Sequence, residues 1–289
     1  MIHEIAPHIF NNQFSKDAAP VDDSPVFVFG TENEPAFGGG AVLISDHHIP
    51  ILRDVKAGGI EADSLTRLFS IDGRDCFLLD SLPAGRLTEE EGFFFKRFRD
   101  IRNVMEIPDH EYFLAMTAYQ LYNWYGNNRF CGRCGGRMRR SEHERALICP
   151  DCGNTVYPKI VPAVTVAIID RERDKLLLTK YAGRDIPFYA LVAGFTEIGE
   201  TLEETVSREA FEETGLRVKN IRYFGSQPWG IVDDLMVGFV CDLDGGNEIH
   251  RDESELKLAD WFSRDKVVLQ PTDMSLTNAL MKAFKEGRI

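Results

Sequence analysis

The residues most able to do chemistry are three glutamates in the stretch 194–216, which reads GFTEIGETLEETVSREAFEETGL. Thr201 is followed three residues later by Glu204, which is the pattern of a capping box at the start of a helix. Gly215 suits the left-handed conformation that commonly ends a helix. The spacing therefore predicts a helix of about fourteen residues between these two signals.

The apolar stripe of this predicted helix continues into carboxylates. Leu202 and Val206 lie on one stripe at 100° per residue, Glu209 and Glu213 fall on the same stripe, and Glu212 lies beside it. Carboxylates this close on a half-buried face repel each other, at about a few kcal/mol per pair. Oxygen-only ligands suit Mg²⁺ or Mn²⁺. The pattern predicts a site for a hard divalent cation; the alternative is a charged helix with arginine partners.

Four of the six cysteines form two CxxC pairs. Cys131 and Cys134 are separated by fourteen residues from Cys149 and Cys152. Two such pairs complete a tetrahedron of thiolates, so we predict a closed, structural zinc site. An iron-based or redox site is the alternative. The other two cysteines are isolated, and this usage favours a reducing compartment.

The cysteine module is rich in arginine although the whole chain is acidic, with a formal net charge of −13. That charge argues against general attraction to nucleic acid or anionic membranes. The local cluster could face RNA, or could pair with acids elsewhere in the protein. Its members are Arg129, Arg133, Arg137, Arg139, Arg140 and Arg145.

The 289 residues are enough for two domains and a small accessory module. We predict an N-terminal mixed α/β domain over 1–126, the zinc ribbon over 127–157 and an α/β domain over 158–289. No stretch approaches about 18 continuous apolar residues, which predicts no transmembrane helix. The opening MIHEIAPHIF lacks a basic flank before an apolar run, so we expect no secretory signal and a cytoplasmic protein.

Residues before the ribbon read as short strands followed by two helices. Thr88 and Glu91 form a second capping-box pattern. The helix predicted after it carries an apolar stripe, for which core or subunit-interface packing is expected. The stripe consists of Phe94, Phe95, Phe98, Ile101 and Met105. A second helix is predicted from Asp109 to Gly126.

At residues 194–216 the chain resembles the Nudix hydrolases and matches every fixed position of their signature box. The matching residues are Gly194, Glu200, Arg208, Glu209, Ala210, Glu212, Glu213, Gly215 and Leu216. The resemblance implies an α/β/α sandwich around a mixed sheet, with the box forming a loop–helix–loop that holds metal. It also implies hydrolysis of a nucleoside diphosphate linked to another group.

A four-cysteine ribbon before such a domain is similar to the NADH pyrophosphatase subgroup. Residues 157–162 match its YPR-x-x-P segment with lysine at 159, and 226–229 match its SQPW. The next residues, 230–234, read GIVDD where the subgroup has Pro-Phe-Pro-x-Ser. The resemblance implies hydrolysis of NAD(H) to nicotinamide mononucleotide and AMP. A second interpretation keeps the enzyme and takes NAD-capped RNA as the substrate, with the arginine cluster as the feature that tests it. The altered loop leaves open a broader hydrolase of ADP-ribose or dinucleoside polyphosphates.

The resemblance also implies roles for individual residues. Catalysis is assigned to Glu209, Glu212, Glu213 and Arg208, and the Mg²⁺ or Mn²⁺ ligands are Glu209, Glu213, Glu255 and the Ala193 carbonyl. Arg208 is expected to lock the glutamates by ion pairing. Substrate contacts are expected from Tyr157, Gln227, Pro228, Trp229, Arg102, Glu144 and Thr277. The subgroup is typically dimeric. A non-catalytic nucleotide sensor is the remaining alternative, although such a protein is expected to lose box glutamates.

Overall fold

The computed structural model describes residues 1–15, 17–30, 40–57, 59, 65–79, 87, 89–104, 106–183 and 187–289, with 90, 103 and 104 as backbone only. The chain forms two compact units. The C-terminal unit contains Met1–Ile2, Ile160–Pro228 and Asp234–Ile289, and the N-terminal unit contains His3–Lys159 and Trp229–Asp233. The chain therefore passes between the units more than once.

The C-terminal unit is built on a six-stranded mixed sheet. Its strands run in the order β14 (Val218–Trp229), β15 (Asp234–Leu243), β11 (Val161–Asp170), β12 (Lys175–Tyr181) and β16 (Leu256–Ser263), and β13 (Val192–Phe195) also pairs with β11. Strand β11 is parallel to β15 and antiparallel to β12 and β13. Its almost continuous apolar sequence is typical of a strand that is buried on both faces.

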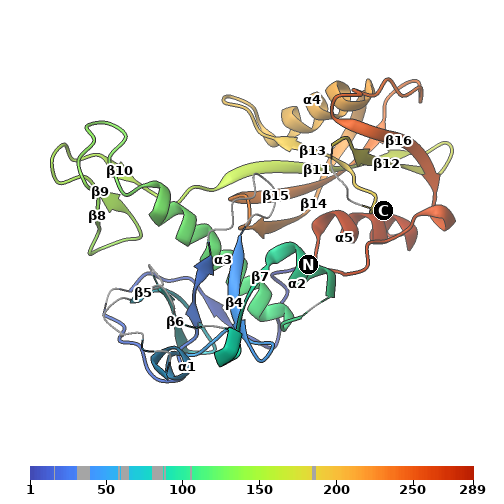
Figure 1. The fold of residues 1–289 in the computed structure, drawn as a ribbon. Coiled ribbons are helices and arrows are strands. Elements are labelled where there is room, and N and C mark those ends of the chain that lie inside the picture. The colour runs from blue at the N-terminus through green and yellow to red at the C-terminus, as the bar shows by residue number, and fades with distance from the viewer. Residues whose placement is uncertain are drawn as a thin grey trace. The chain divides into compact units, whose positions relative to one another are not determined.

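Helices cover the two faces of this sheet, α4 (Leu202–Thr214) on one and α5 (Leu276–Lys285) on the other (Figure 1). Alternate β11 side chains enter separate cores. Val166 packs in the core that contains Val206 of α4, whereas Ala167 packs in the core that contains Leu280 of α5. The expected α/β/α sandwich is confirmed.

Among the described residues, the N-terminal unit has three sheets, one of them in the ribbon, and three α-helices, as expected of a mixed α/β region. The first sheet has the order β1 (Phe10–Asn11), β5 (Leu65–Ile71), β6 (Arg74–Leu79) and β2 (Val26–Phe27), and the second has β3 (Phe29–Gly30), β4 (Ala41–Ser45) and β7 (Phe93–Arg97). The helices are α1 (Leu52–Ala57), α2 (Phe98–Val104) and α3 (Asp109–Asn127). Helix α3 confirms the second predicted helix.

The prediction of a first helix after residue 91 is wrong for the first half of that segment. Phe94 and Phe95 lie in strand β7, which pairs antiparallel with β4, and the helix begins only at Phe98. Aromatic residues fit a pleated surface well, and the pairing with β4 decides the conformation here. Thr88 and Met105, two members of the predicted pattern, lie outside the described residues.

Candidate active site and zinc centre

Helix α4 begins and ends where its sequence signals predicted. The Thr201 hydroxyl accepts a hydrogen bond from the Glu204 amide at 3.2 Å, and the Glu204 carboxylate accepts one from the Thr201 amide at 2.8 Å. Gly215 ends the helix with φ = 71°, in the left-handed region. The capping box and the glycine therefore fix both ends of the helix that carries the glutamates.

The two glutamates on the apolar stripe are buried, with Glu213 2% and Glu209 8% exposed, whereas Glu212 is exposed. Among the described residues, no donor reaches either carboxylate oxygen of Glu213 with the full geometry of a hydrogen bond, although the Ala193 amide lies nearby. Burial, reinforced by the charge of Glu209, raises the pKa of Glu213 to about 8, and the Ala193 amide opposes this shift. Burial also raises the pKa of Glu209. Such a pair needs a proton or a cation.

Arg208 lies at the centre of an ion-pair network beside this pair. Its guanidinium donates to both oxygens of Glu200 at 2.6 and 2.9 Å, to Glu209 at 2.7 Å and to Glu212 at 3.0 Å. It also donates to the Phe195 carbonyl at 2.8 Å. Hydrogen bonding by Arg208 lowers the pKa of Glu200 to about 2. The ion pairing expected of Arg208 is confirmed.

A loop after β15 covers the C-terminal end of α4. The Asp252 amide donates to the Glu213 carbonyl and the His250 amide donates to the Thr214 carbonyl, each at 2.9 Å. Glu255 follows in this loop, and its negative charge raises the pKa of both buried glutamates of α4. An unbonded buried carboxylate among further acids fits a hard divalent cation with oxygen ligands.

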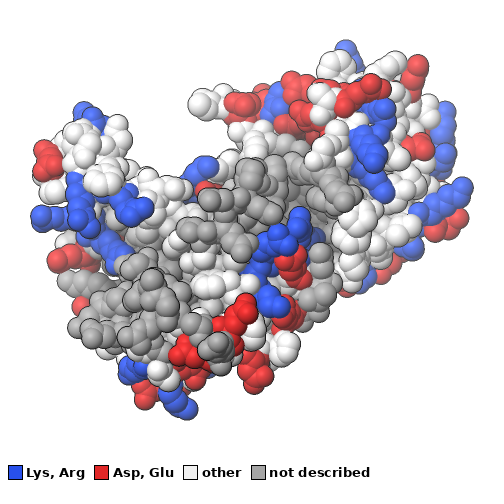
Figure 2. All heavy atoms as spheres, viewed as in Figure 1, with Lys and Arg blue, Asp and Glu red and all other residues white. Residues whose placement is uncertain are grey.

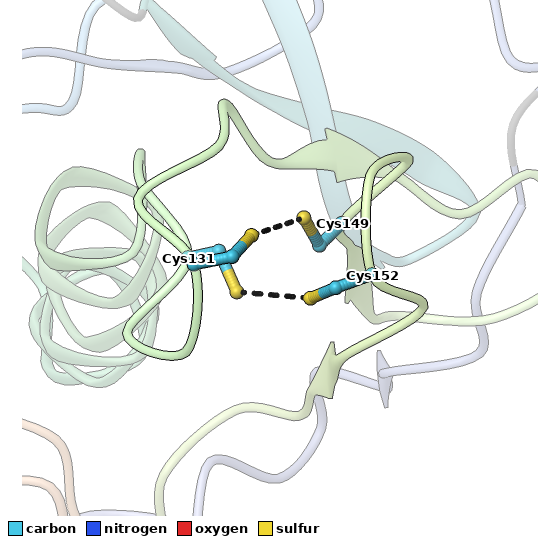
Figure 3. A group of neighbouring side chains, drawn as sticks. Cys131, Cys149 and Cys152 are labelled. Carbon is cyan, nitrogen blue, oxygen red and sulfur yellow. Dashed lines mark hydrogen bonds between the residues drawn. The ribbon is translucent and has the colours of Figure 1, made fainter.

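The four cysteines of the ribbon converge on one point, as the sulfurs of Cys131, Cys149 and Cys152 show in Figure 3. All four sulfurs lie within 4.8 Å of one another, with Cys131–Cys152 at 3.7 Å and Cys134–Cys149 at 3.4 Å. Tetrahedral zinc with bonds of about 2.3 Å places its sulfurs at similar separations. Strands β8 (Arg139–Arg140), β9 (Leu147–Ile148) and β10 (Thr155–Val156) carry this closed thiolate site.

Comparison with known proteins agrees with both sites. The profile described as "NUDIX domain" matches residues 159–283, and the "NADH pyrophosphatase zinc ribbon domain" matches 127–157. The chain is 37% identical over 253 residues to the NAD-capped RNA hydrolase NudC of Mannheimia succiniciproducens, covering 84% of this chain and 91% of that protein. The chain belongs to the Nudix hydrolase family.

Other relatives of this Nudix protein match a smaller part of it. NudC of Haemophilus influenzae strain PittEE, also named an NAD-capped RNA hydrolase, is 38% identical over 182 residues, which are 61% of this chain and 68% of that protein. A solved Nudix hydrolase structure from Nitrosomonas europaea is 26% identical, with a TM-score of 0.46, and covers 55% of this chain and 92% of that one. The two profile matches and the NudC relative from Mannheimia succiniciproducens confirm the resemblance drawn from the box and the ribbon.

Four of the predicted substrate contacts lie in the N-terminal unit and form two pairs. The Tyr157 hydroxyl donates to Glu144 at 3.1 Å. The Arg102 guanidinium lies 5.3 Å from the ring centroid of Trp229, which is within cation–π range. The Arg102–Trp229 pair joins residues far apart in sequence, but for both pairs a role in substrate binding stays a prediction.

The remaining predicted contacts lie in the C-terminal unit of the Nudix protein. Gln227 is 2% exposed, and among the described residues its Oε1 atom has no hydrogen-bond partner. Pro228 is exposed, and Thr277 lies in the first turn of α5. A buried amide oxygen without a partner is available to a ligand donor, which is consistent with the expectation for Gln227.

Two residues near the Nudix glutamates were not singled out from the sequence. Phe195 follows the box glycine, its ring is 49% exposed, and its carbonyl is held by Arg208. Asp252 is linked by its amide to Glu213. An exposed aromatic residue in the box loop is a readable signal for Phe195, whereas the Asp252 contact depends on folding.

Among the described residues, no helix combines the length and apolar character needed to cross a membrane.

Proposed function

We propose that this Nudix hydrolase cleaves the pyrophosphate bond of NAD(H)-type dinucleotides, giving nicotinamide mononucleotide and AMP, with Mg²⁺ or Mn²⁺ as cofactor. The observation that carries the proposal is Glu213, a buried carboxylate whose oxygens have no hydrogen-bond partner in the described chain, next to buried Glu209. The zinc ribbon type and the NudC relatives support NAD(H) as the substrate class.

The residues that would hold the divalent ion are Glu209, Glu213, Glu255 and the Ala193 carbonyl. When bound, such an ion neutralises a diphosphate and lowers the pKa of a coordinated water. Arg208 holds Glu209 from one side and so fixes the direction of its carboxylate. A carboxylate of this cluster is the candidate to accept the proton of the attacking water.

The test is a turnover panel with each metal ion in turn. The substrates are NADH, NAD⁺, ADP-ribose, diadenosine polyphosphates and NAD-capped RNA, with the products separated by chromatography. The proposal expects NADH to yield the two mononucleotides only when Mg²⁺ or Mn²⁺ is present. Equal or faster turnover of ADP-ribose and dinucleoside polyphosphates would favour the broader hydrolase, which the altered loop at 230–234 supports.

We also propose NAD-capped RNA as a substrate, because the relatives are named for it. Lys and Arg side chains gather over the ribbon strands β8 to β10 (Figure 2). Arg133, Arg137 and Arg139 are exposed there. By contrast, Arg145 is directed inward and donates to Asn12 and to the Leu68 carbonyl. The exposed arginines are therefore the candidates for contacting phosphates of the RNA body.

Charge reversal separates the RNA role from catalysis. Arg137→Glu should raise KM for NAD-capped RNA and weaken its dependence on salt, while NADH turnover is unchanged. Arg288→Glu, at an exposed residue near the C-terminus, serves as the matched control and should alter neither. If Arg137→Glu and Arg288→Glu raised KM for NAD-capped RNA equally, the cause would be the net charge of the protein and not a contact at Arg137.

We propose further that the protein is a cytoplasmic homodimer. None of its six cysteines forms a disulfide, as a reducing compartment allows. Phe94 and Phe95, each 39% exposed, lie on β7 at the edge of its sheet, where a second copy could pair. Light scattering on the purified protein should give twice the mass of the chain, and Phe94→Lys should shift it towards the monomer.

A further inference from the structure

The altered loop after Trp229 is anchored to helix α3. Residues 229–233 belong to the N-terminal unit. A Cβ added at Gly230 would lie 2.4 Å from the Met116 carbonyl oxygen and 2.9 Å from its carbon, distances that no real side chain tolerates. Glycine therefore allows the loop to lie directly against the backbone of α3. The ring of Trp229, at the start of this loop, faces Arg102.

Helix α3 also holds the segment that carries Tyr157. The side-chain amide of Gln120 donates to the Lys159 carbonyl at 2.8 Å. Lys159 in turn places its ammonium 3.8 Å from the Asp233 carboxylate, at the far end of the loop. The Asp233 side chain is 24% exposed and its backbone has φ = 64°, whereas the Lys159 side chain is 65% exposed. One ion pair thus joins the two segments.

We propose that Lys159 and Asp233 are a positioning pair for substrate recognition. The pair fixes the turn after Trp229 relative to the Tyr157 segment, and the ammonium offsets a carboxylate that would repel an anionic diphosphate. This inference rests on the proposed function, since it takes Trp229 and Tyr157 as substrate contacts. Lys159 departs from the subgroup pattern, which has arginine at this position, and Asp233 stands at a position that the pattern leaves unspecified.

The single substitution of Lys159 and the added substitution of Asp233 should change KM for NADH in opposite directions. Lys159→Met leaves a partly buried carboxylate without its cation, so KM for NADH should rise by about two- to fivefold with kcat unchanged. Adding Asp233→Asn should bring KM back towards the parent value, because no unpaired charge remains. Lys159→Arg should retain the parent KM. Lys219→Met, which breaks an exposed Lys219–Asp244 pair, is the matched control and should not change KM.

Hydrogen exchange of residues 226–236 gives a readout that does not depend on turnover. Exchange there should increase in Lys159→Met while the melting temperature stays near that of the parent. Additive effects of the two substitutions on KM, or unchanged KM and exchange in Lys159→Met, would overturn the inference. Failure of the parent to hydrolyse any dinucleotide would instead count against the proposed function, and the exchange comparison would still decide whether the pair positions the loop.

Discussion

Gly194 and Glu209 lie so close that a Cβ at position 194 would be 2.0 Å from the Glu209 carboxyl carbon. The box glycine therefore makes room for the carboxylate that we propose as catalytic. Gly194→Ala should displace that carboxylate and lower kcat by at least about tenfold, with a smaller effect on stability because α4 keeps its caps. Steady-state kinetics and a thermal melt check both parts.

Gly225→Ala is the control for that substitution. The nearest side-chain atom to its added Cβ would be 3.9 Å away, an ordinary contact, and the residue does not need the left-handed region. It should behave like the parent in kcat. If Gly194→Ala and Gly225→Ala lost the same fraction of activity, the loss would result from replacing any glycine and not from the contact between Gly194 and Glu209.

Glu209→Gln tests the catalytic pair directly. The amide keeps the shape of the side chain but removes the charge, so kcat should fall by about two to four orders of magnitude. The melting curve should resemble that of the parent, because the substitution neutralises a carboxylate that is buried at a cost. Unchanged turnover with an unchanged melt would refute the assignment.

Stability of the protein without magnesium or manganese should depend on pH through Glu213. Its pKa is raised in the folded state to about 8 from an ordinary value near 4.5, so the folded state binds a proton that the unfolded state releases. The free energy of unfolding should therefore fall as pH rises between these values, by at most about 1.4 kcal/mol per pH unit from this group. Urea melts at pH 5.5 and pH 8 of zinc-loaded protein, in buffer free of magnesium and manganese, provide the measurement.

Glu213→Gln is the comparison for the pH experiment. The amide does not titrate, so the fall in stability between pH 5.5 and pH 8 should be clearly smaller in this variant. A variant that keeps the full dependence of the parent would show that other groups produce it.

Removal of zinc should destabilise the fold, whereas removal of magnesium should stop turnover. Cys149→Ser breaks the four-thiolate site, so the protein should lose its zinc and melt at a lower temperature. Cys76→Ala removes a thiol that is remote from the site in sequence and should keep one zinc per chain. Metal analysis and circular dichroism test this, and a zinc-free protein with the parent's melt would contradict a structural role.

The sequence was most informative where the signals are local. The caps of α4 and the buried position of Glu209 depend on residues within one loop and helix, so periodicity and spacing were sufficient, whereas the ion pairing of Arg208 was expected from the family resemblance. Strand β7 was misassigned because its partner β4 lies about fifty residues earlier in the chain. A short aromatic run fits a helix or a strand, and only the distant pairing decides between them.

Contacts between segments that are distant in the chain also could not be predicted from the sequence. Arg145 belongs to an arginine cluster in the sequence, yet in the fold it binds Asn12 and the Leu68 carbonyl. The close approach of Gly230 to Met116 likewise depends on the folded N-terminal unit. Spacing shows which residues can do chemistry, whereas packing determines which of them remain available for a partner.

The most direct test of the central claim is the position of manganese in crystals of the protein soaked with Mn²⁺. We expect an anomalous peak bound by the Glu209 and Glu213 carboxylates, and its loss in Glu213→Gln. Manganese only at scattered surface acids, with the α4 carboxylates unbound, would contradict it.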